Sequence, residues 1–346
     1  MALFSRNKTT VGLDIGSGLI KVAVIDHSKK TPELVRVTVT PLLDDAIVEG
    51  EVMDPGIVAD AIKAAITAAG VKPDNVVTAV GGRDVIIKKI SIERVKEAQA
   101  QELMRWEAEQ HVPFDMDSVE LDFQILDPDA EGLEMSVLLV AAKRELIESK
   151  TRILTDAGIE PSIVDVESFA LHNAFELNHP DAMSGLVALV NIGHDVTNII
   201  VMDDGVPLLT RDLTVGTRRF REDLQRERGL SAEDAQGLLQ GYDRSPHLES
   251  VIETRGEEIA VGIERAAAFL AQNSRGSGVR AIYTCGGGSR IPGLNDSLAH
   301  RLGFSVQQAN PLANVNVRPG ALESLVTDEI APLLMLPIGL ALRHVA

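Results

Sequence analysis

The sequence of 346 residues has little cysteine, few aromatic side chains and no long apolar run. Its single cysteine, Cys285, excludes an internal disulfide, so nothing in the sequence points to an oxidising compartment. Aromatic residues make up 3% of the chain, which predicts a core of mainly aliphatic side chains. The longest apolar stretch, residues 330–342, contains two prolines and is shorter than the ~20 residues that a membrane-spanning helix needs.

Positive charge is also scarce, because 33 Lys and Arg residues face 51 Asp and Glu residues, for a net charge of −18. Such an acidic surface repels phosphate backbones, so we expect no nucleic-acid partner. The first eight residues lack the apolar segment of a signal peptide, and the length suits about two domains. We therefore expect a cytoplasmic protein that does not itself insert into a membrane.

One pattern occurs twice, at residues 11–26 and 188–203: an apolar strand, a polar turn with glycine, and a second apolar strand. Asp14 aligns with Asn191 and Gly16 with Gly193 at a single, constant offset. The offset is much longer than the ~20–50 residues of a solenoid repeat, so it indicates a duplicated half-molecule. Two similar halves that face each other would form a cleft with both turns pointing into it.

The turn of each hairpin has the features of a phosphate site. Glycine lets backbone N–H groups approach a ligand closely, and successive N–H groups form a concavity that binds anions. Ser17 would add a hydroxyl donor, and Lys21 would add a positive charge near a phosphate oxygen. Asp14 ends the first strand, where it could hold Mg²⁺ through water. Either hairpin alone fits an ordinary surface turn equally well, but two copies in register favour the phosphate site.

A third glycine-rich segment, Gly286 to Gly288, follows a short apolar strand at residues 279–285. We expect a helix to open after it, near Ile291. A backbone in this arrangement can lie flat against a nucleotide. A lone triple glycine is usually a flexible turn, but this one is the third member of an ordered set.

The ordered set resembles the superfamily of actin, Hsp70 and the sugar kinases, over essentially the whole chain. The resemblance implies an α/β, actin-like (ribonuclease H-like, duplicated) two-lobed fold, with connecting helices at residues 164–171 and 337–342. It also implies that ATP and Mg²⁺ bind between the lobes. The residues it assigns to phosphate and metal are Asp14, Gly16, Ser17, Gly18, Lys21, Asn191, Gly193, His194, Asp195 and Thr197. Those it assigns to adenosine are Gly286, Gly287, Gly288 and Arg290. For His194 and Thr197, a place on the solvent side of the hairpin is an equally good explanation.

The segment between the first hairpin and the first connecting helix identifies a narrower family. Its pattern predicts an α+β insert with strands at 85–92, 119–126 and 134–142 and a helix at 97–111. The insert's position resembles that of the extra subdomain of FtsA, and the sequence of residues 103–115 is similar to a motif of the PilM family of type IV pilus machines. We expect Trp106 and Phe114 in this segment to pack between the insert and the main domain. The expected boundaries are residues 1–82, 146–185 and 328–346 for the first lobe, 83–145 for the insert and 186–327 for the second lobe.

The family resemblance implies partners as well as a fold. PilM-like proteins bind the N-terminal cytoplasmic tail of the inner-membrane protein PilN in a groove between first lobe and insert, as an extended peptide docks on a sheet edge or in an apolar slot. By analogy, the groove here would be lined by Val85, Ile86, Ile87 and Lys88. The protein would then act as an adaptor held at the inner membrane through this partner. A pilus motor ATPase and further copies of the chain are additional candidate partners.

Two departures from the superfamily pattern bear on catalysis. Asn191 replaces the usual aspartate of the second hairpin and brings no negative charge for a metal. The Glu and Lys that contact ribose and base in FtsA-like sequences are missing near Gln236 and Leu239, where Glu233 or Asp234 would have to replace them. We therefore expect ATP to be bound but hydrolysed slowly or not at all.

Glu167 is the residue expected to orient the attacking water, with Asp14 as the second catalytic carboxylate. An equally good interpretation of Glu167 is a residue at a helix start that interacts with the helix dipole. Two other functions compete with the adaptor. A filament-forming protein like FtsA would end in an amphipathic membrane helix, which we do not expect here. A small-molecule kinase would need a general base beyond Asp14 and Glu167, and the sequence offers no obvious one.

Overall fold

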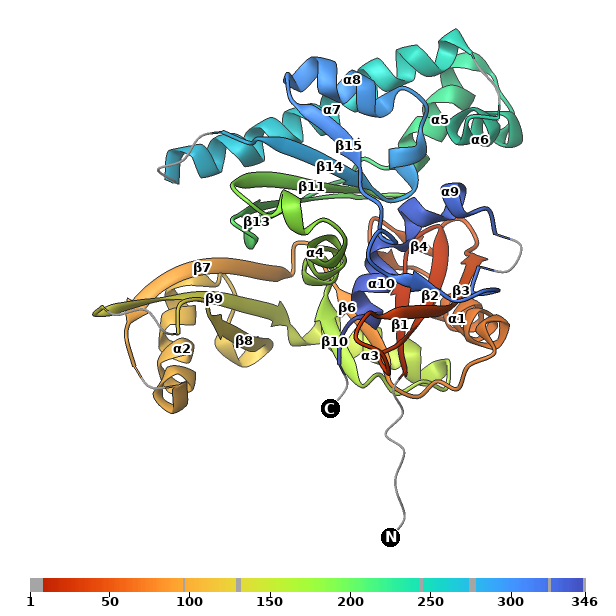
Figure 1. Cartoon of the computed structure of the whole chain (residues 1–346). Helices are drawn as coiled ribbons and strands as arrows, with labels where there is room; N and C mark the ends of the chain where they lie inside the picture. Colours follow the sequence, from red (N-terminus) through yellow and green to blue (C-terminus); the bar gives the residue numbers. More distant parts are fainter. Residues whose placement is uncertain are drawn as a thin grey trace.

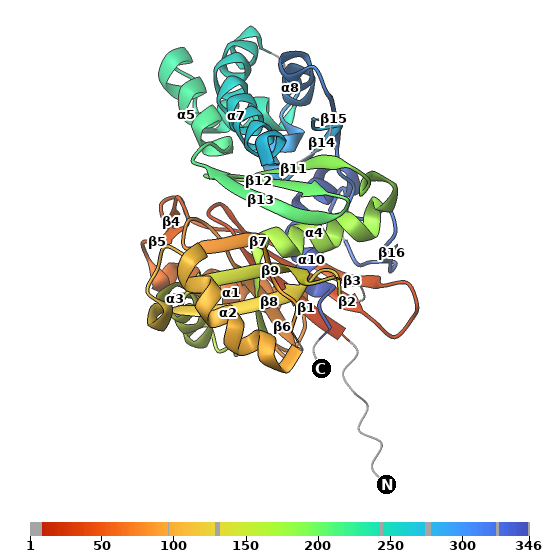
Figure 2. The same ribbon diagram turned by 90° about the vertical axis from the view of Figure 1, so that its left-hand side faces the viewer.

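The computed structural model describes residues 9–344 except 96, 129–131, 243–244, 274–277 and 323–324. The chain forms two lobes, one above the other in Figure 1, and an insert beside the lower one. Two helices, α4 (Glu167–Asn178) and α10 (Met335–Ala341), lie at the centre between the sheets of the two lobes (Figures 1 and 2).

The first lobe is built on a six-stranded sheet with the order β10-β6-β1-β2-β3-β16. Both faces of this sheet are covered, so its central strands are apolar throughout rather than alternating. Val22 and Val24 pack toward α1 and α3, whereas Ala23 and Ile25 pack toward α4 and α10. The elements are β1 (Thr9–Ile15), β2 (Leu19–Asp26), β3 (Glu33–Pro41), β6 (Val76–Val80), β10 (Ile163–Val166), β16 (Asn316–Val317), α1 (Pro55–Ala69) and α3 (Arg144–Asp156).

Helix α1 shows how local sequence fixes an element. It begins after Asp54, whose carboxylate accepts a hydrogen bond from the Ile57 N–H at 3.0 Å, and Pro55 is its first residue. It ends at Gly70, which has a left-handed φ of 63°. Before it, the short hairpin of β4 (Ile47–Val48) and β5 (Glu51–Val52) projects from the loop after β3.

The second lobe repeats the start of the first. Its sheet has the order β13-β12-β11-β14-β15, so a three-stranded meander is again followed by a parallel strand. Both expected hairpins are present in the same register, with Asp14 opposite Lys21 in the first and Asn191 opposite Asn198 in the second. The strands are β11 (Leu186–Ile192), β12 (Thr197–Asp203), β13 (Val206–Leu213), β14 (Ala281–Cys285) and β15 (Ser305–Gln308). The helices are α5 (Thr217–Arg228), α6 (Ala232–Gln240), α7 (Pro246–Asn273) and α8 (Leu294–Leu302).

The helices α4 (Glu167–Asn178) and α10 (Met335–Ala341) cross at close range. A Cβ atom on Gly339 would lie 1.7 Å from the carbonyl oxygen of Ala170, and one on Gly12 would lie 2.1 Å from that of Pro337. These glycines therefore let α10 lie directly on α4 and on β1. The short helix α9 (Thr327–Ile330) leads into α10 through a 3₁₀ turn at Ala331–Leu334.

The insert is a three-stranded antiparallel sheet, β7-β9-β8, with α2 on one face. Its elements are β7 (Val85–Glu93), α2 (Glu97–His111), β8 (Val119–Ile125) and β9 (Glu134–Lys143). It has a core of its own around Met104, Met135 and Leu139. Its strand β7 also contacts β13 of the second lobe (Figure 2).

The structure corrects two expectations. Trp106 does not pack between the insert and the main domain, because its side chain on α2 is 67% exposed. Phe114, by contrast, packs on the insert core, with the Lys143 ammonium 4.8 Å from the centre of its ring. The helix expected to open near Ile291 begins three residues later at Leu294, because the glycine turn first forms a 3₁₀ turn at Gly287–Arg290.

Candidate functional site

A cavity of about 1300 Å³ lies between the lobes. Both hairpin turns, the glycine turn after β14 and the start of α4 meet there. The sequence-predicted site residues that line it are Asp14, Gly16, Ser17, Gly18, Lys21, Glu167, Asn191, Gly193, His194, Gly286, Gly287 and Arg290.

Three predicted residues do not line this cavity. The Thr197 side chain is fully buried, and its hydroxyl donates to the Val215 carbonyl at 2.6 Å. A Cβ atom on Gly288 would lie 2.1 Å from the side chain of Ile192, so this glycine serves packing against β11. Asp195 is turned toward the first lobe, where one of its carboxylate oxygens accepts the Glu49 N–H at 2.9 Å.

The first hairpin brings one acid and one base together at the cavity. Asp14 and Lys21 are cross-strand partners, and the Lys21 ammonium lies 2.6 Å from the Asp14 carboxylate. Lys21 therefore pairs with Asp14 here rather than standing alone. The Gly16 N–H closes the turn by donating to the Leu19 carbonyl at 3.1 Å. The next part of the turn touches the second lobe, because a Cβ atom on Gly18 would lie 2.9 Å from the His194 ring.

At the second hairpin, two asparagine side-chain amides and one carboxylate form a chain of hydrogen bonds. The Asn191 amide donates to the Asn198 side-chain oxygen at 3.0 Å, and the Asn198 amide donates to the Asp212 carboxylate at 2.9 Å. Asn198 and Asp212 both line the cavity, and burial raises the pKa of Asp212. The carboxylate that the second hairpin's chain brings to the cavity thus comes from Asp212 on β13, and position 191 supplies an amide instead. Asp212 was not predicted from the sequence, because only the β12–β13 register brings it beside Asn198.

Glu167 stands at the first position of α4 and faces the cavity. Its carboxylate lies against Gly81, where an added Cβ atom would be 2.5 Å from a Glu167 oxygen. Burial is the main cause that raises the pKa of Glu167, to about 7; the nearby Lys150 charge opposes the shift and the Asp14 charge adds to it. At neutral pH, Glu167 is therefore divided between its protonated and ionised forms.

Lys150, on α3, lines the same cavity and was not predicted from the sequence. Burial lowers its pKa, against the opposing influence of the Glu167 and Asp14 charges. A signal was present, because Lys150 follows Leu146 by four residues and precedes Ile153 by three, which places it on the inward face of the helix.

The arrangement suits a Mg²⁺ ion that arrives with a phosphate better than a resident metal. The carboxylates of Asp14, Glu167 and Asp212 are among those that line the cavity. Within the described residues, however, no cluster of three or more His, Cys, Asp or Glu side chains is arranged to hold a metal ion. Mg²⁺ commonly binds through one or two carboxylates plus phosphate oxygens and waters, and Asp14 and Asp212 are the residues that fit this role.

The glycine turn after β14 also lines the cavity, beside the second hairpin. Gly286 has a φ of 81°, its N–H donates to the Pro332 carbonyl at 2.8 Å, and a Cβ atom there would lie 2.5 Å from the Asn191 side chain. The turn therefore requires glycine for its close approach to the second hairpin. Apolar and amide side chains surround it, which suits a flat heterocycle with a polar edge. These neighbours are Gln236, Leu239, Gln240, Ile291 and Leu333.

Glu233 and Asp234, the expected replacements for the missing adenosine contacts, do not line the cavity. Asp234 instead belongs to the start of α6, where its N–H donates to the Ser231 hydroxyl at 3.1 Å. The cavity side of α6 carries Gln236, Leu239 and Gln240, one turn farther along.

The four residues expected to line a partner groove lie on two different faces of β7. Val85 and Ile87 pack toward the junction with the first lobe, beside Val80 and Ala142. Ile86 packs on the insert core, and Lys88 is exposed with its ammonium 3.3 Å from the His111 ring. Side chains alternate along a strand, so four consecutive residues cannot form one wall.

Comparisons with known proteins identify both a family and a similar solved structure. The model of the family described as type IV pilus assembly protein PilM matches residues 12–345. A structure of a PilM-PilN type IV pilus biogenesis complex matches with a TM-score of 0.83 and 28% identity, over 97% of this chain and 98% of that chain.

More distant structures show the fold alone. The ethanolamine utilization protein EutJ from Carboxydothermus hydrogenoformans matches with a TM-score of 0.56 and 19% identity, over 96% of this chain and 89% of that chain. MreB 5 of Spiroplasma citri bound to AMPPNP matches with a TM-score of 0.53 and 12% identity, over 96% and 95% of the two chains. The actin-like fold expected from the sequence is thereby confirmed.

Proposed function

The chain belongs to the PilM family of type IV pilus assembly proteins, and we propose that it is a nucleotide-dependent adaptor. It binds ATP with Mg²⁺ between its lobes and docks the N-terminal cytoplasmic tail of a PilN-like inner-membrane protein between the first lobe and the insert. The matching structure is a complex of PilM with PilN, which supports this partner. No helix in the described ranges is both long and apolar enough to cross a membrane, and the proposed partner would supply membrane attachment.

One observation carries the nucleotide part of the proposal. Two hairpin turns and a glycine turn, far apart in the sequence, converge on one cavity. In this proposal the turn at Ser17 and Gly18 and the Lys21 ammonium hold phosphate oxygens, with Asp14 and Asp212 as ligands of Mg²⁺. Mg²⁺, when bound, neutralises phosphate charge.

The same residues favour slow turnover. Glu167 is the candidate for orienting water, but with a pKa of about 7 it is ionised in only part of the molecules at neutral pH. The Asn191 amide is hydrogen-bonded to Asn198 and adds no charge. We expect steady-state ATP hydrolysis well below the order of 1 s⁻¹ that is typical of kinases. A rate at or above this value would contradict the slow-turnover proposal.

Calorimetric titration of the full chain tests both parts. ATP-Mg²⁺ should bind the unmodified protein and bind about tenfold or more weakly to Lys21→Met, because a charge-assisted contact to phosphate is lost. Lys63→Met removes the same charge from the exposed face of α1, and its affinity should be unchanged. Equal binding by all three proteins would remove Lys21 from the site.

The peptide part is tested with the N-terminal cytoplasmic peptide of the PilN-like protein from the same genome, with and without ATP-Mg²⁺. Ile87→Ala should weaken its binding, since Ile87 lies where insert and first lobe join. Lys89→Ala, on the exposed outer part of the same strand, is the matched control. Absence of peptide binding in both nucleotide states would overturn the adaptor proposal and leave the fold unaffected.

A further inference from the structure

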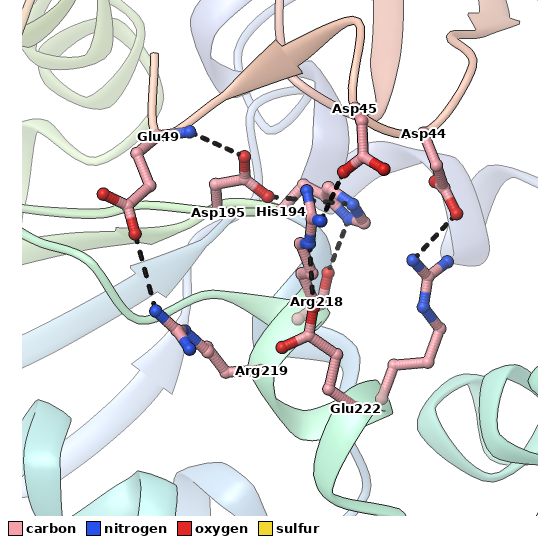
Figure 3. Close-up of polar contacts among 10 residues, drawn as sticks. Asp44, Asp45, Glu49, His194, Asp195, Arg218, Arg219 and Glu222 are labelled. Atoms are coloured by element: carbon pink, nitrogen blue, oxygen red, sulfur yellow. Dashed lines mark hydrogen bonds and ion pairs between the residues drawn. The ribbon is translucent and has the colours of Figure 1, made fainter. Parts of the chain in front are cut away.

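The two lobes meet a second time beside the cavity, away from the crossing helices. The first lobe contributes the loop at residues 42–53, which carries the β4–β5 hairpin. The second lobe contributes the turn of its first hairpin and the start of α5. Figure 3 shows that acidic side chains from the loop face arginines from the helix.

Three ion pairs cross between the lobes at this place. They join the Arg218 guanidinium to the Asp45 carboxylate at 2.5 Å, that of Arg221 to Asp44 at 3.1 Å and that of Arg219 to Glu49 at 3.5 Å. All three acids come from one loop and all three arginines from the first turns of one helix, so the pairs form or break together as the lobes move.

The arginines are held in place by their own lobe. Glu222, one turn farther along α5, accepts a hydrogen bond from the Arg218 Nε at 3.0 Å and so fixes the guanidinium that faces Asp45. The helix start is fastened to the hairpin turn, because the N–H groups of Thr217 and Arg218 donate to the carbonyls of Gly193 and His194 at 3.0 and 2.9 Å. The helix start and the turn that faces the cavity therefore move as one unit.

The loop at residues 42–53 also has a backbone hydrogen bond to the second lobe and an uncommon backbone conformation. The Glu49 N–H donates to the buried Asp195 carboxylate at 2.9 Å, a further bond between the lobes. Asp45 and Glu49 have φ values of 64° and 50°, which are uncommon for residues other than glycine. Such a backbone persists where its surroundings hold it, and here the contacts with the second lobe do so.

We propose that these ion pairs form a latch that closes the phosphate side of the cavity and sets the rate of nucleotide exchange. The latch rests on the proposed nucleotide site, because Asp44, Glu49 and Arg221 themselves line the cavity. Opening separates the loop from α5 while the lobes stay joined at α4 and α10. Asp45 is 68% exposed and Arg219 47% exposed, so each pair is individually weak and sensitive to salt, and the latch can open in water.

The first test neutralises the acids and keeps their shape. In the triple variant Asp44→Asn, Asp45→Asn, Glu49→Gln, release of a fluorescent ATP analogue, followed by stopped flow, should be about tenfold faster than in the unmodified chain. Added salt should speed release from the unmodified chain and have little effect on the variant. The matched control, Glu257→Gln with Glu264→Gln, removes two carboxylates that pair with Arg301 inside the second lobe, and it should release the analogue at the unmodified rate.

The second test needs no nucleotide. Spin labels at Asp60→Cys on α1 and Glu253→Cys on α7 report the distance between the lobes, while the buried native Cys285 stays unlabelled. The distance should lengthen or its distribution broaden in the triple variant. If the unmodified chain binds no ATP analogue, the proposed function fails, yet this measurement still tests the latch. An unchanged distance, or unchanged release despite a changed distance, would overturn the latch.

Discussion

At the scale of single residues, Glu167 is the side chain whose surroundings most change its chemistry. It begins a helix, lies on the backbone of Gly81 and shares the cavity with Asp14 and Lys150. Burial raises its pKa to about 7, whereas an unfolded chain leaves a glutamate near 4.5. The folded protein therefore binds a proton that the unfolded chain releases between these two values.

This difference predicts a pH-dependent stability. Between about pH 4.5 and 7 the folded state holds more protons, so the free energy of unfolding falls as pH rises through this window. Glu167→Gln removes the titration, so relative to the unmodified chain it should gain about 1 kcal/mol between pH 5 and 8. We expect less than the full linkage value because water in the cavity solvates the carboxylate. Urea unfolding at several pH values measures the effect.

The matched control for this measurement is Glu148→Gln, on the exposed face of α3. Its unfolding should follow the pH dependence of the unmodified chain. If Glu167→Gln does the same, the buried, proton-binding state of Glu167 is wrong, and with it the reason we give for slow turnover.

Lys150 offers a second prediction at this scale. Its charge lowers the pKa of Glu167, so Lys150→Met should raise that pKa further. The stability loss assigned to Glu167 should then extend to higher pH than in the unmodified chain. The carboxyl carbon of Glu167, followed by ¹³C NMR across the pH range, reports the shift directly. A midpoint that stays in place or moves down would show that the two charges do not interact.

At the scale of elements, the crossing of α4 and α10 depends on Gly339, which has a hydrogen atom where other residues have a side chain. A Cβ atom on Gly339 would meet a backbone oxygen of α4 at 1.7 Å, and a backbone cannot move aside as a flexible side chain can. Gly339→Ala should therefore lower the free energy of unfolding by about 3 kcal/mol or prevent folding. Chemical denaturation gives the value.

A second glycine makes the matched control. Gly237 lies inside α6, and an added Cβ atom there has no neighbour within 4 Å. Gly237→Ala should leave stability unchanged or raise it by up to about 1 kcal/mol, because alanine is the better helix former. If both substitutions have the same small effect, the close crossing of α4 and α10 is not as tight as the structure shows.

Elements were predictable from the sequence where the signal was local. Two apolar strands around a glycine turn predicted each hairpin, and the constant offset between the two copies predicted the duplication. The contacts between elements that are distant in the sequence were not predictable. Asp212 reaches the cavity through strand register, and the pairs between residues 44–49 and α5 join segments some 170 positions apart in the sequence. The prediction for Trp106 was wrong because a large apolar residue in a helix was expected to pack between the insert and the main domain, whereas its side chain faces solvent.

At the scale of the whole molecule, one hydrophobic cluster spans both lobes, whereas the insert's core is a separate cluster. One cluster joins Ile25 and Leu34 of the first sheet to Leu189 and Ile200 of the second, with Phe175 of α4 between them. The insert has a separate cluster around Met104 and Leu139. The two lobes should therefore lose structure together, and the insert should be able to open by itself.

Hydrogen exchange read by mass spectrometry distinguishes these units. Phe175→Ala removes a fully buried side chain at a cost of about 3–5 kcal/mol and should lower protection in both β1–β2 and β11–β12. Met104→Ala, an equally buried change, should lower protection only within residues 85–142. If Phe175→Ala loosened one lobe and left the other protected, the lobes would be independent folding units. The crossing helices would then act as a hinge between two cores rather than as the middle of one.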